Sequence, residues 1–222
     1  MVWRWACERL ATSRQRAVAQ PVSGAGLMQL WLVRHAQPLV EAGVCYGATD
    51  MPADAAATAA ACAALAPRLP QGAQIGCSPR RRCMQLADAL LQARPDLSLQ
   101  TDERLVEMDF GCWEGVRWDA IPKAEIDAWT AQFWLWRFGG RDTVSALMAR
   151  VGAAWADAQR SREPVVWLTH AGVVRAATLL ARGITAVHHA DQWPVQAPGF
   201  GQLVTLRLLP VALAGSATRA PG

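Results

Sequence analysis

The chain has 222 residues, of which 52% are hydrophobic and 18% charged, and its formal net charge is +4. This composition is typical of a globular protein that is long enough to bury a full core. Four arginines and one glutamate lie within residues 1–27, so the remainder is nearly neutral and carries no basic footprint for nucleic acid.

Residues 1–27 are basic but lack the continuous apolar segment of a signal peptide and the length of a membrane span. We expect them to be a disordered extension or a mis-assigned start, with the true beginning at Met28. The expected organisation is one domain over 28–210 with a helical insertion, followed by a tail over 211–222. The six cysteines include no C-x-x-C pair, which favours reduced thiols in a cytoplasmic protein.

Apolar runs alternate with alanine-rich stretches along the chain. In order, and with approximate bounds, the predicted elements are strand 28–34, helix 53–67, strand 73–77, helix 81–94, strand 97–101, helix 143–160, strand 164–169, helix 171–183 and strand 201–209. Asp142 or Thr143 can cap the third helix, and Gly183 can end the fourth. The alternation predicts an α/β fold: a three-layer sandwich with a mostly parallel sheet, helices on both faces and an antiparallel last strand at an edge.

Residues 110–140 interrupt this alternation with five tryptophans: Trp113, Trp118, Trp129, Trp134 and Trp136. We expect a helical insertion that covers one end of the sheet and the active site. Most of these rings should simply pack the insertion onto the domain, while one or two could stack on a flat substrate.

Two of the predicted strands run directly into a histidine. Arg34 and His35 follow the first strand, and Thr169 and His170 end the fourth. Ligands bind at the carboxyl ends of strands in open α/β sheets, so the pair predicts a phosphate site with two histidines. The alternative for Arg34 and His35 alone is a strand that ends at the surface.

Four segments, in this order, resemble those of the histidine phosphatase superfamily, which is also called phosphoglycerate mutase-like. They are LVRHAQP, CSPRRRCMQLADAL, RLVEMDFGCWEG and LTHAGVVRA, and they span about residues 28–209. One segment alone would be weak evidence, whereas the ordered set is specific.

The resemblance implies hydrolysis of a phosphomonoester through a phosphohistidine. His35 would be the nucleophile, Glu107 the general acid and base, and His170 would stabilise charge on the transferred group. Arg34 and Arg82 would each hold phosphate oxygens with a planar guanidinium. With these groups present, no metal or other cofactor is expected, and the partner is a small-molecule phosphomonoester rather than a nucleic acid or a membrane.

Several of these assignments compete with neighbouring residues. The family pattern selects Arg82 over Arg80 and Arg81, which could belong to a solvated helix start. It selects Glu107 as the acid over Asp109 and Glu114. The adjacent His188 and His189 lack a carboxylate or cysteine at ligand spacing, so we expect loop residues rather than metal ligands.

Within the superfamily, the chain most resembles α-ribazole-5′-phosphate phosphatases of cobalamin biosynthesis. The resemblance lies in the segments GVCYGATDMP, EMDFGCWEGVRWDAIP and GGRDTV. Gln37, Tyr46 and Trp113 are candidate substrate contacts. The chain departs from the family at Ala36, where glycine is usual, and at Asp142-Thr143, where the subgroup has Glu-Ser.

Other functions stay open at this point. They are a broad small-metabolite phosphatase, a phosphoglycerate mutase-like enzyme, and an inactive relative that serves as a binding module. The sequence also leaves the oligomeric state open, a homodimer included.

Overall fold

The computed structural model describes residues 28–208, so the expectations for residues 1–27 and 211–222 lie outside the described residues. Five strands form one sheet in the order β3-β2-β4-β1-β5. They are β1 (Met28–Arg34), β2 (Gln74–Cys77), β3 (Ser98–Thr101), β4 (Val165–Thr169) and β5 (Leu203–Leu208). Only β5 runs antiparallel, at the edge beside β1. The predicted α/β fold with a mostly parallel sheet is confirmed.

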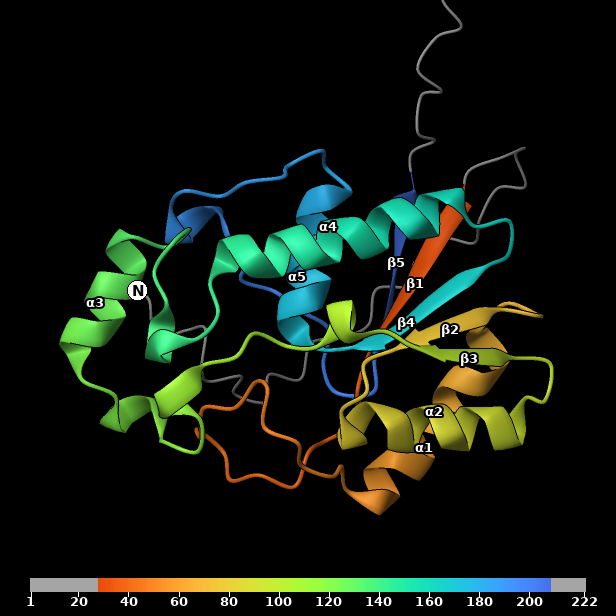
Figure 1. The fold of residues 1–222 in the computed structure, drawn as a ribbon. Helices are drawn as coiled ribbons and strands as arrows, with labels where there is room; N and C mark the ends of the chain where they lie inside the picture. Colours follow the sequence, from red (N-terminus) through yellow and green to blue (C-terminus); the bar gives the residue numbers. More distant parts are fainter. Residues whose placement is uncertain (1–27, 209–222) are drawn as a thin grey trace, which may run out of the picture.

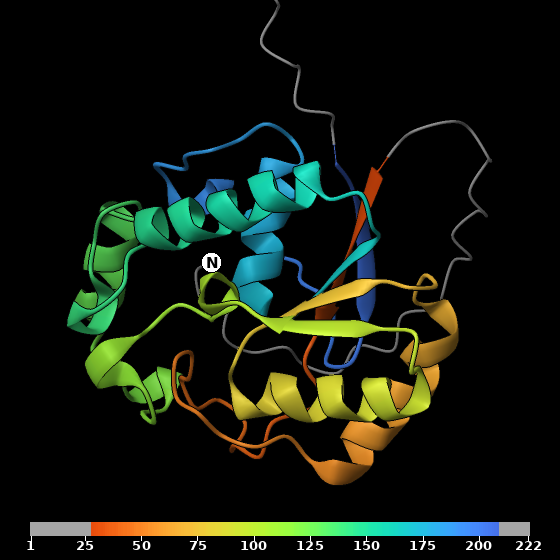
Figure 2. The ribbon, with the colours of Figure 1, turned by 45° about the vertical axis from the view of Figure 1, so that its right-hand side comes forward.

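Helices cover both faces of the sheet, as Figures 1 and 2 show. α1 (Ala55–Leu65) and α2 (Arg81–Ala93) lie on one face, and α4 (Val144–Arg160) and α5 (Ala171–Leu180) on the other. A separate apolar cluster fills the space on each side. β4, between the two clusters, is buried at all five positions, which explains its uninterrupted apolar sequence. No helix of the described chain is long and apolar enough to cross a membrane.

The structure decides between the two predicted caps of α4 and shows how α5 ends. Thr143, rather than Asp142, caps α4: its hydroxyl accepts a hydrogen bond from the backbone N of Ala146 at 3.0 Å. Gly183 lies three residues beyond the end of α5, where it adopts a φ of +74° that favours glycine.

The tryptophan-rich insertion contains one helix, α3 (Lys123–Ala131), which lies apart from the other helices in Figure 1. Trp129 stacks on the buried Phe138 with ring centroids 4.4 Å apart, and Trp118 stacks on the same ring at 5.9 Å. Trp113 also contacts Phe138, so much of the aromatic content packs the insertion together. The remaining described helices are 3-10 turns, at Ala66–Arg68, Glu103–Leu105, Gly111–Trp113, Trp118–Ala120, Phe138–Gly140 and Ala190–Gln192.

Candidate active site

The pairing of β1 with β4 places two histidines side by side. Arg34 is the register partner of Thr169, so His35 and His170, which follow them, leave the sheet at the same edge. Their ring centroids are 5.2 Å apart with an interplanar angle of 60°, and both residues are almost fully buried. The structure therefore brings together the two histidines that the strand ends predicted.

A contact with the backbone indicates which nitrogen of His35 carries the proton. Its Nδ1 lies 2.7 Å from the backbone oxygen of Ala36, and a carbonyl can only accept, so Nδ1 carries the proton and Nε2 keeps its lone pair. Burial, and then the charge of Arg82, lower the pKa of His35 well below its ordinary value of 6.5. The ring is therefore neutral at neutral pH.

Arg82 is fully buried in the first turn of α2. Its Nη1 donates to the backbone oxygen of Thr49 and its Nη2 to that of Gly47, both at 2.6 Å. Neutral carbonyls orient the guanidinium without cancelling its charge. Arg81 is exposed and Arg80 half-buried at the helix start, so Arg82 alone of this run is fully enclosed.

His170 is oriented by two further contacts. Nη2 of Arg82 lies 3.2 Å from Nδ1 of His170, and since arginine can only donate, Nδ1 is the acceptor. The other ring nitrogen, Nε2, then carries the proton and donates to the Ser78 hydroxyl at 2.8 Å. Burial, followed by the charge of Arg82, lowers the pKa of His170 well below 6.5.

The proline- and glycine-rich loop at residues 194–201 contacts Arg34. The guanidinium carbon of Arg34 lies 3.8 Å from the ring centre of Phe200, and Nη1 donates to the backbone oxygen of Pro198 at 3.1 Å. The same ring lies 5.5 Å from His35. Sequence reasoning missed Phe200 and Ser78; Phe200 is the one aromatic residue of its proline- and glycine-rich loop.

Glu107 lies against the first turn of α5. Its Oε2 accepts from the backbone N of Gly172 at 2.9 Å and its Oε1 from that of Met108 at 3.0 Å. The N-terminal end of a helix favours a carboxylate. A Cβ atom at Gly172 would stand 2.2 Å from Oε1 of Glu107, so this close approach requires glycine.

The competing acids have other tasks. Glu114 accepts hydrogen bonds from the backbone N of Ala48 at 2.7 Å, of Thr49 at 2.6 Å and of Phe110 at 3.0 Å, and from the Thr49 hydroxyl. Burial raises the pKa of Glu114, but these hydrogen bonds outweigh it and the net shift is downward. Asp109 closes a turn by accepting from Gly111 N at 2.8 Å. Glu114 thus holds the loop whose carbonyls orient Arg82.

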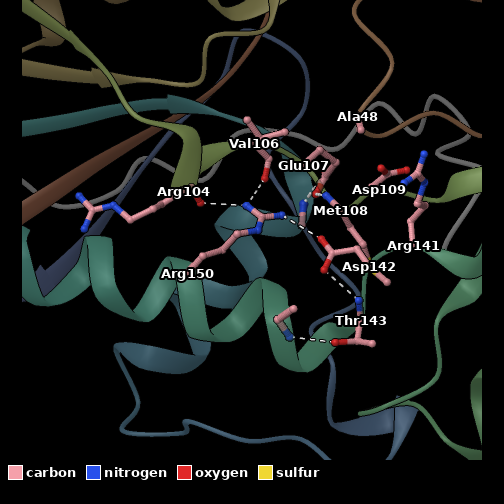
Figure 3. A network of polar contacts seen from close by, with 12 residues as sticks. Ala48, Arg104, Val106, Glu107, Met108, Asp109, Arg141, Asp142, Thr143 and Arg150 are labelled. Atoms are coloured by element: carbon pink, nitrogen blue, oxygen red, sulfur yellow. Dashed lines mark hydrogen bonds and ion pairs between the residues drawn. The ribbon is translucent and has the colours of Figure 1, made fainter.

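Arg150 of α4 fixes the segment that leads into Glu107 (Figure 3). Its Nη1 donates to the backbone oxygens of Arg104, at 2.9 Å, and Val106, while Nη2 pairs with Oδ2 of Asp142 at 3.4 Å. Oδ1 of Asp142 in turn accepts from the backbone N of Thr143. The Asp142-Thr143 departure therefore serves helix capping and loop support.

Ala36, the other departure from the family pattern, fits its place without backbone strain. No described residue other than glycine has a positive φ, so the alanine meets no left-handed requirement here. Its side chain is buried in the core beside the sheet.

An apolar hollow adjoins Glu107 and Gly172. Its volume is about 950 Å³ with the open mouth included, and aromatic rings form much of its wall. Of the three candidate substrate contacts, none is among its lining residues: Gln37 is exposed, Tyr46 lies with its ring 5.6 Å from the Arg82 guanidinium, and Trp113 packs on Phe138. Within residues 28–208, no group of three or more His, Cys, Asp or Glu side chains could hold a metal ion.

The chain is similar to known proteins in sequence and in fold. Residues 30–198 match the family model of the histidine phosphatase superfamily, branch 1. The solved structure of TTHB049 from Thermus thermophilus is similar, with 28% identity and a TM-score of 0.60 over 82% of this chain and 99% of that one. A mycobacterial glucosyl-3-phosphoglycerate phosphatase shares the fold at 22% identity and a TM-score of 0.65, over 81% and 90% of the two chains. No curated protein matches the chain.

The two lowered histidine pKa values predict a pH-dependent stability. Below pH 6.5 the unfolded chain binds protons that the folded His35 and His170 do not, so the free energy of unfolding falls as the pH drops from 7.5 towards 5.5. Each histidine contributes up to about 1.4 kcal/mol per pH unit in this window. Urea unfolding at several pH values measures the slope.

A variant with His35→Asn and His170→Asn removes both groups and should flatten this slope. An unchanged slope in that variant would show that other groups cause the loss of stability.

Proposed function

The chain belongs to the histidine phosphatase superfamily, and we propose that it hydrolyses phosphomonoesters through a phosphohistidine on His35. The observation that carries the proposal is the buried ring of His35, which lies beside Arg82 and His170 and has its Nδ1 2.7 Å from the Ala36 carbonyl, so that Nε2 is left to act as a base or nucleophile. A neutral imidazole can attack phosphorus, and two guanidinium groups can balance the charge of a phosphate dianion.

The proposed first step transfers the phosphoryl group. Arg34 and Arg82 hold its oxygens while Nε2 of His35 attacks phosphorus, so a P–N bond forms as the P–O bond to the alcohol breaks. Glu107, in its protonated form, gives its proton to the leaving oxygen. His170 stays neutral, and its Nε2–H, which donates to the Ser78 hydroxyl in the free protein, would donate to a phosphate oxygen instead.

In the second step, water attacks the phosphohistidine. The Glu107 carboxylate takes a proton from this water, the P–N bond breaks, and inorganic phosphate leaves with His35 restored. The cycle consumes one ester and one water and needs only groups of this chain.

For the natural substrate, we propose α-ribazole 5′-phosphate, which would place the protein in cobalamin biosynthesis in the cytoplasm. Support comes from the subgroup-like segments around Tyr46, Glu107 and Asp142, and from the apolar hollow beside Glu107. A glycosylated phosphoglycerate is the second candidate, because a mycobacterial protein of the same fold is a glucosyl-3-phosphoglycerate phosphatase.

The nucleophile can be tested by trapping. With ³²P-labelled substrate and rapid acid-free quenching, the wild-type protein should carry labelled phosphate, whereas His35→Asn should carry none and show no turnover. Arg81→Gln, at an exposed position of the same region, is the control and should label as the wild type does. Labelled phosphate on the His35→Asn variant would refute the assignment.

The acid role of Glu107 predicts a selective effect of Gly172→Ala. The added methyl group must displace the Glu107 carboxylate, so kcat on an alkyl phosphate should fall by ~10²–10⁴-fold. Turnover of 4-nitrophenyl phosphate should fall far less, because its leaving group needs no proton.

Gly152→Ala in α4 is the matched control, since a Cβ there meets no atom within 4 Å. It should leave both activities unchanged. Equal losses on the two substrates in Gly172→Ala would argue against Glu107 as the acid.

The substrate proposal predicts a ranking. Values of kcat/KM should be highest for α-ribazole 5′-phosphate in a panel with glucosyl-3-phosphoglycerate, 3-phosphoglycerate and common sugar phosphates. A higher value for the glucosyl compound would favour the second candidate, and a flat ranking would favour a broad phosphatase.

A further inference from the structure

We propose that the hollow beside Glu107 is a subsite for a planar aromatic or heteroaromatic ring in the alcohol part of the substrate. The inference rests on the proposed phosphatase activity and adds a specificity determinant to it. The residues concerned come from segments that are distant in sequence: the stretch after Glu107, α3, the start of α4, the start of α5 and the turn at residues 190–193.

The wall of the hollow is mainly aromatic. The rings that line it are those of Phe110, Trp118, Trp129, Phe133 and Trp193. They hold one another in place by ring contacts: Trp129 stacks on Phe133 with centroids 5.7 Å apart, and Trp193 meets Phe133 edge-on at 6.0 Å. Phe133 and Trp193 are also almost fully buried, so the wall is preformed. Preformed hollows with a mainly apolar and aromatic lining and a few polar groups are typical small-molecule sites.

The position of the hollow selects which part of the substrate enters it. Glu107 lines the hollow, whereas Arg34, His35, Arg82 and His170 do not. An acid that protonates the leaving oxygen must lie beside that oxygen, on the side of phosphorus away from the nucleophile. The carbon skeleton attached to this oxygen therefore extends from Glu107 towards the aromatic wall.

The chemistry of the lining narrows the ligand class. Apart from Glu107, the polar groups of the lining side chains are the hydroxyl of Thr130, the guanidinium of Arg175 and the indole N–H groups of Trp118, Trp129 and Trp193. The hydroxyl of Thr130 already donates to the backbone oxygen of Ile126 at 2.7 Å. The guanidinium of Arg175 donates to the backbone oxygen of Val195 at 3.2 Å. Most of the remaining wall is aromatic carbon, which offers the several hydroxyl groups of a sugar few hydrogen-bond partners. A flat ring can stack on or meet the tryptophan faces.

Two primary alkyl phosphates with leaving groups of similar basicity test the subsite: 2-(2-naphthyl)ethyl phosphate and 2-methylpropyl phosphate. The ratio of their kcat/KM values reports the contribution of the ring independently of the chemical step. We expect a ratio of at least about ten in favour of the naphthyl compound, as expected for burial of an aromatic ring.

Thr130→Phe fills the hollow from α3 with a ring of the protein itself and should lower this ratio at least about tenfold. Ala131→Phe adds the same side chain to the next, exposed position of the helix and should leave the ratio unchanged. A ratio near one in the wild type, or a ratio that Thr130→Phe does not lower, would overturn the subsite.

Failure of the phosphatase proposal gives a different result, because neither phosphate is then hydrolysed. In that case, calorimetric binding of 2-(2-naphthyl)ethanol decides. Binding that is weakened by Thr130→Phe but not by Ala131→Phe supports the subsite, and absence of binding to the wild type overturns it.

Discussion

The geometry of the site depends on the hydrogen bonds of the buried Arg82 guanidinium. Among residues 28–208 no carboxylate forms an ion pair with it; its partners are the carbonyls of residues 47 and 49 and the ring of His170. Burying such a charge is costly unless hydrogen bonds orient it and a counterion arrives. Burial, and after it the same charge, lower the pKa values of both histidines, so Arg82 helps to keep His35 and His170 neutral.

Much of the fold follows from local pattern. The bounds of each predicted strand agree with those of an observed strand to within about two residues. The agreement arises because the hydrophobic pattern of each segment matches the burial that the fold gives it. The meeting of His35 and His170 could also be predicted, since parallel neighbouring strands end at one edge. The prediction that His35 and His170 meet assumes that β1 and β4 are neighbours in the sheet. The two similar strand ends suggest this neighbourhood, but the sequence does not establish it.

The contacts that orient these residues could not be predicted in the same way. Phe200 under Arg34, Ser78 beside His170 and Gly172 against Glu107 are placed by packing between segments far apart in sequence. The insertion shows the same limit. Composition predicted an aromatic covering, but only the structure separates Trp113, which packs on Phe138, from Trp129, which contacts Phe138 and also lines the hollow.

The carboxylate of Glu114 connects two parts of the site. It binds the backbone of residues 48 and 49, next to the carbonyls that orient Arg82, and also the backbone of Phe110, whose ring lines the hollow. A single half-buried side chain thereby connects the loop that orients Arg82 to the segment that carries Phe110. In the proposed enzyme, the distance between Arg82 and the hollow would select substrates by length. An ester would bind well only if the linker between its phosphorus and its ring allows the phosphate to reach Arg82 while the ring lies in the hollow.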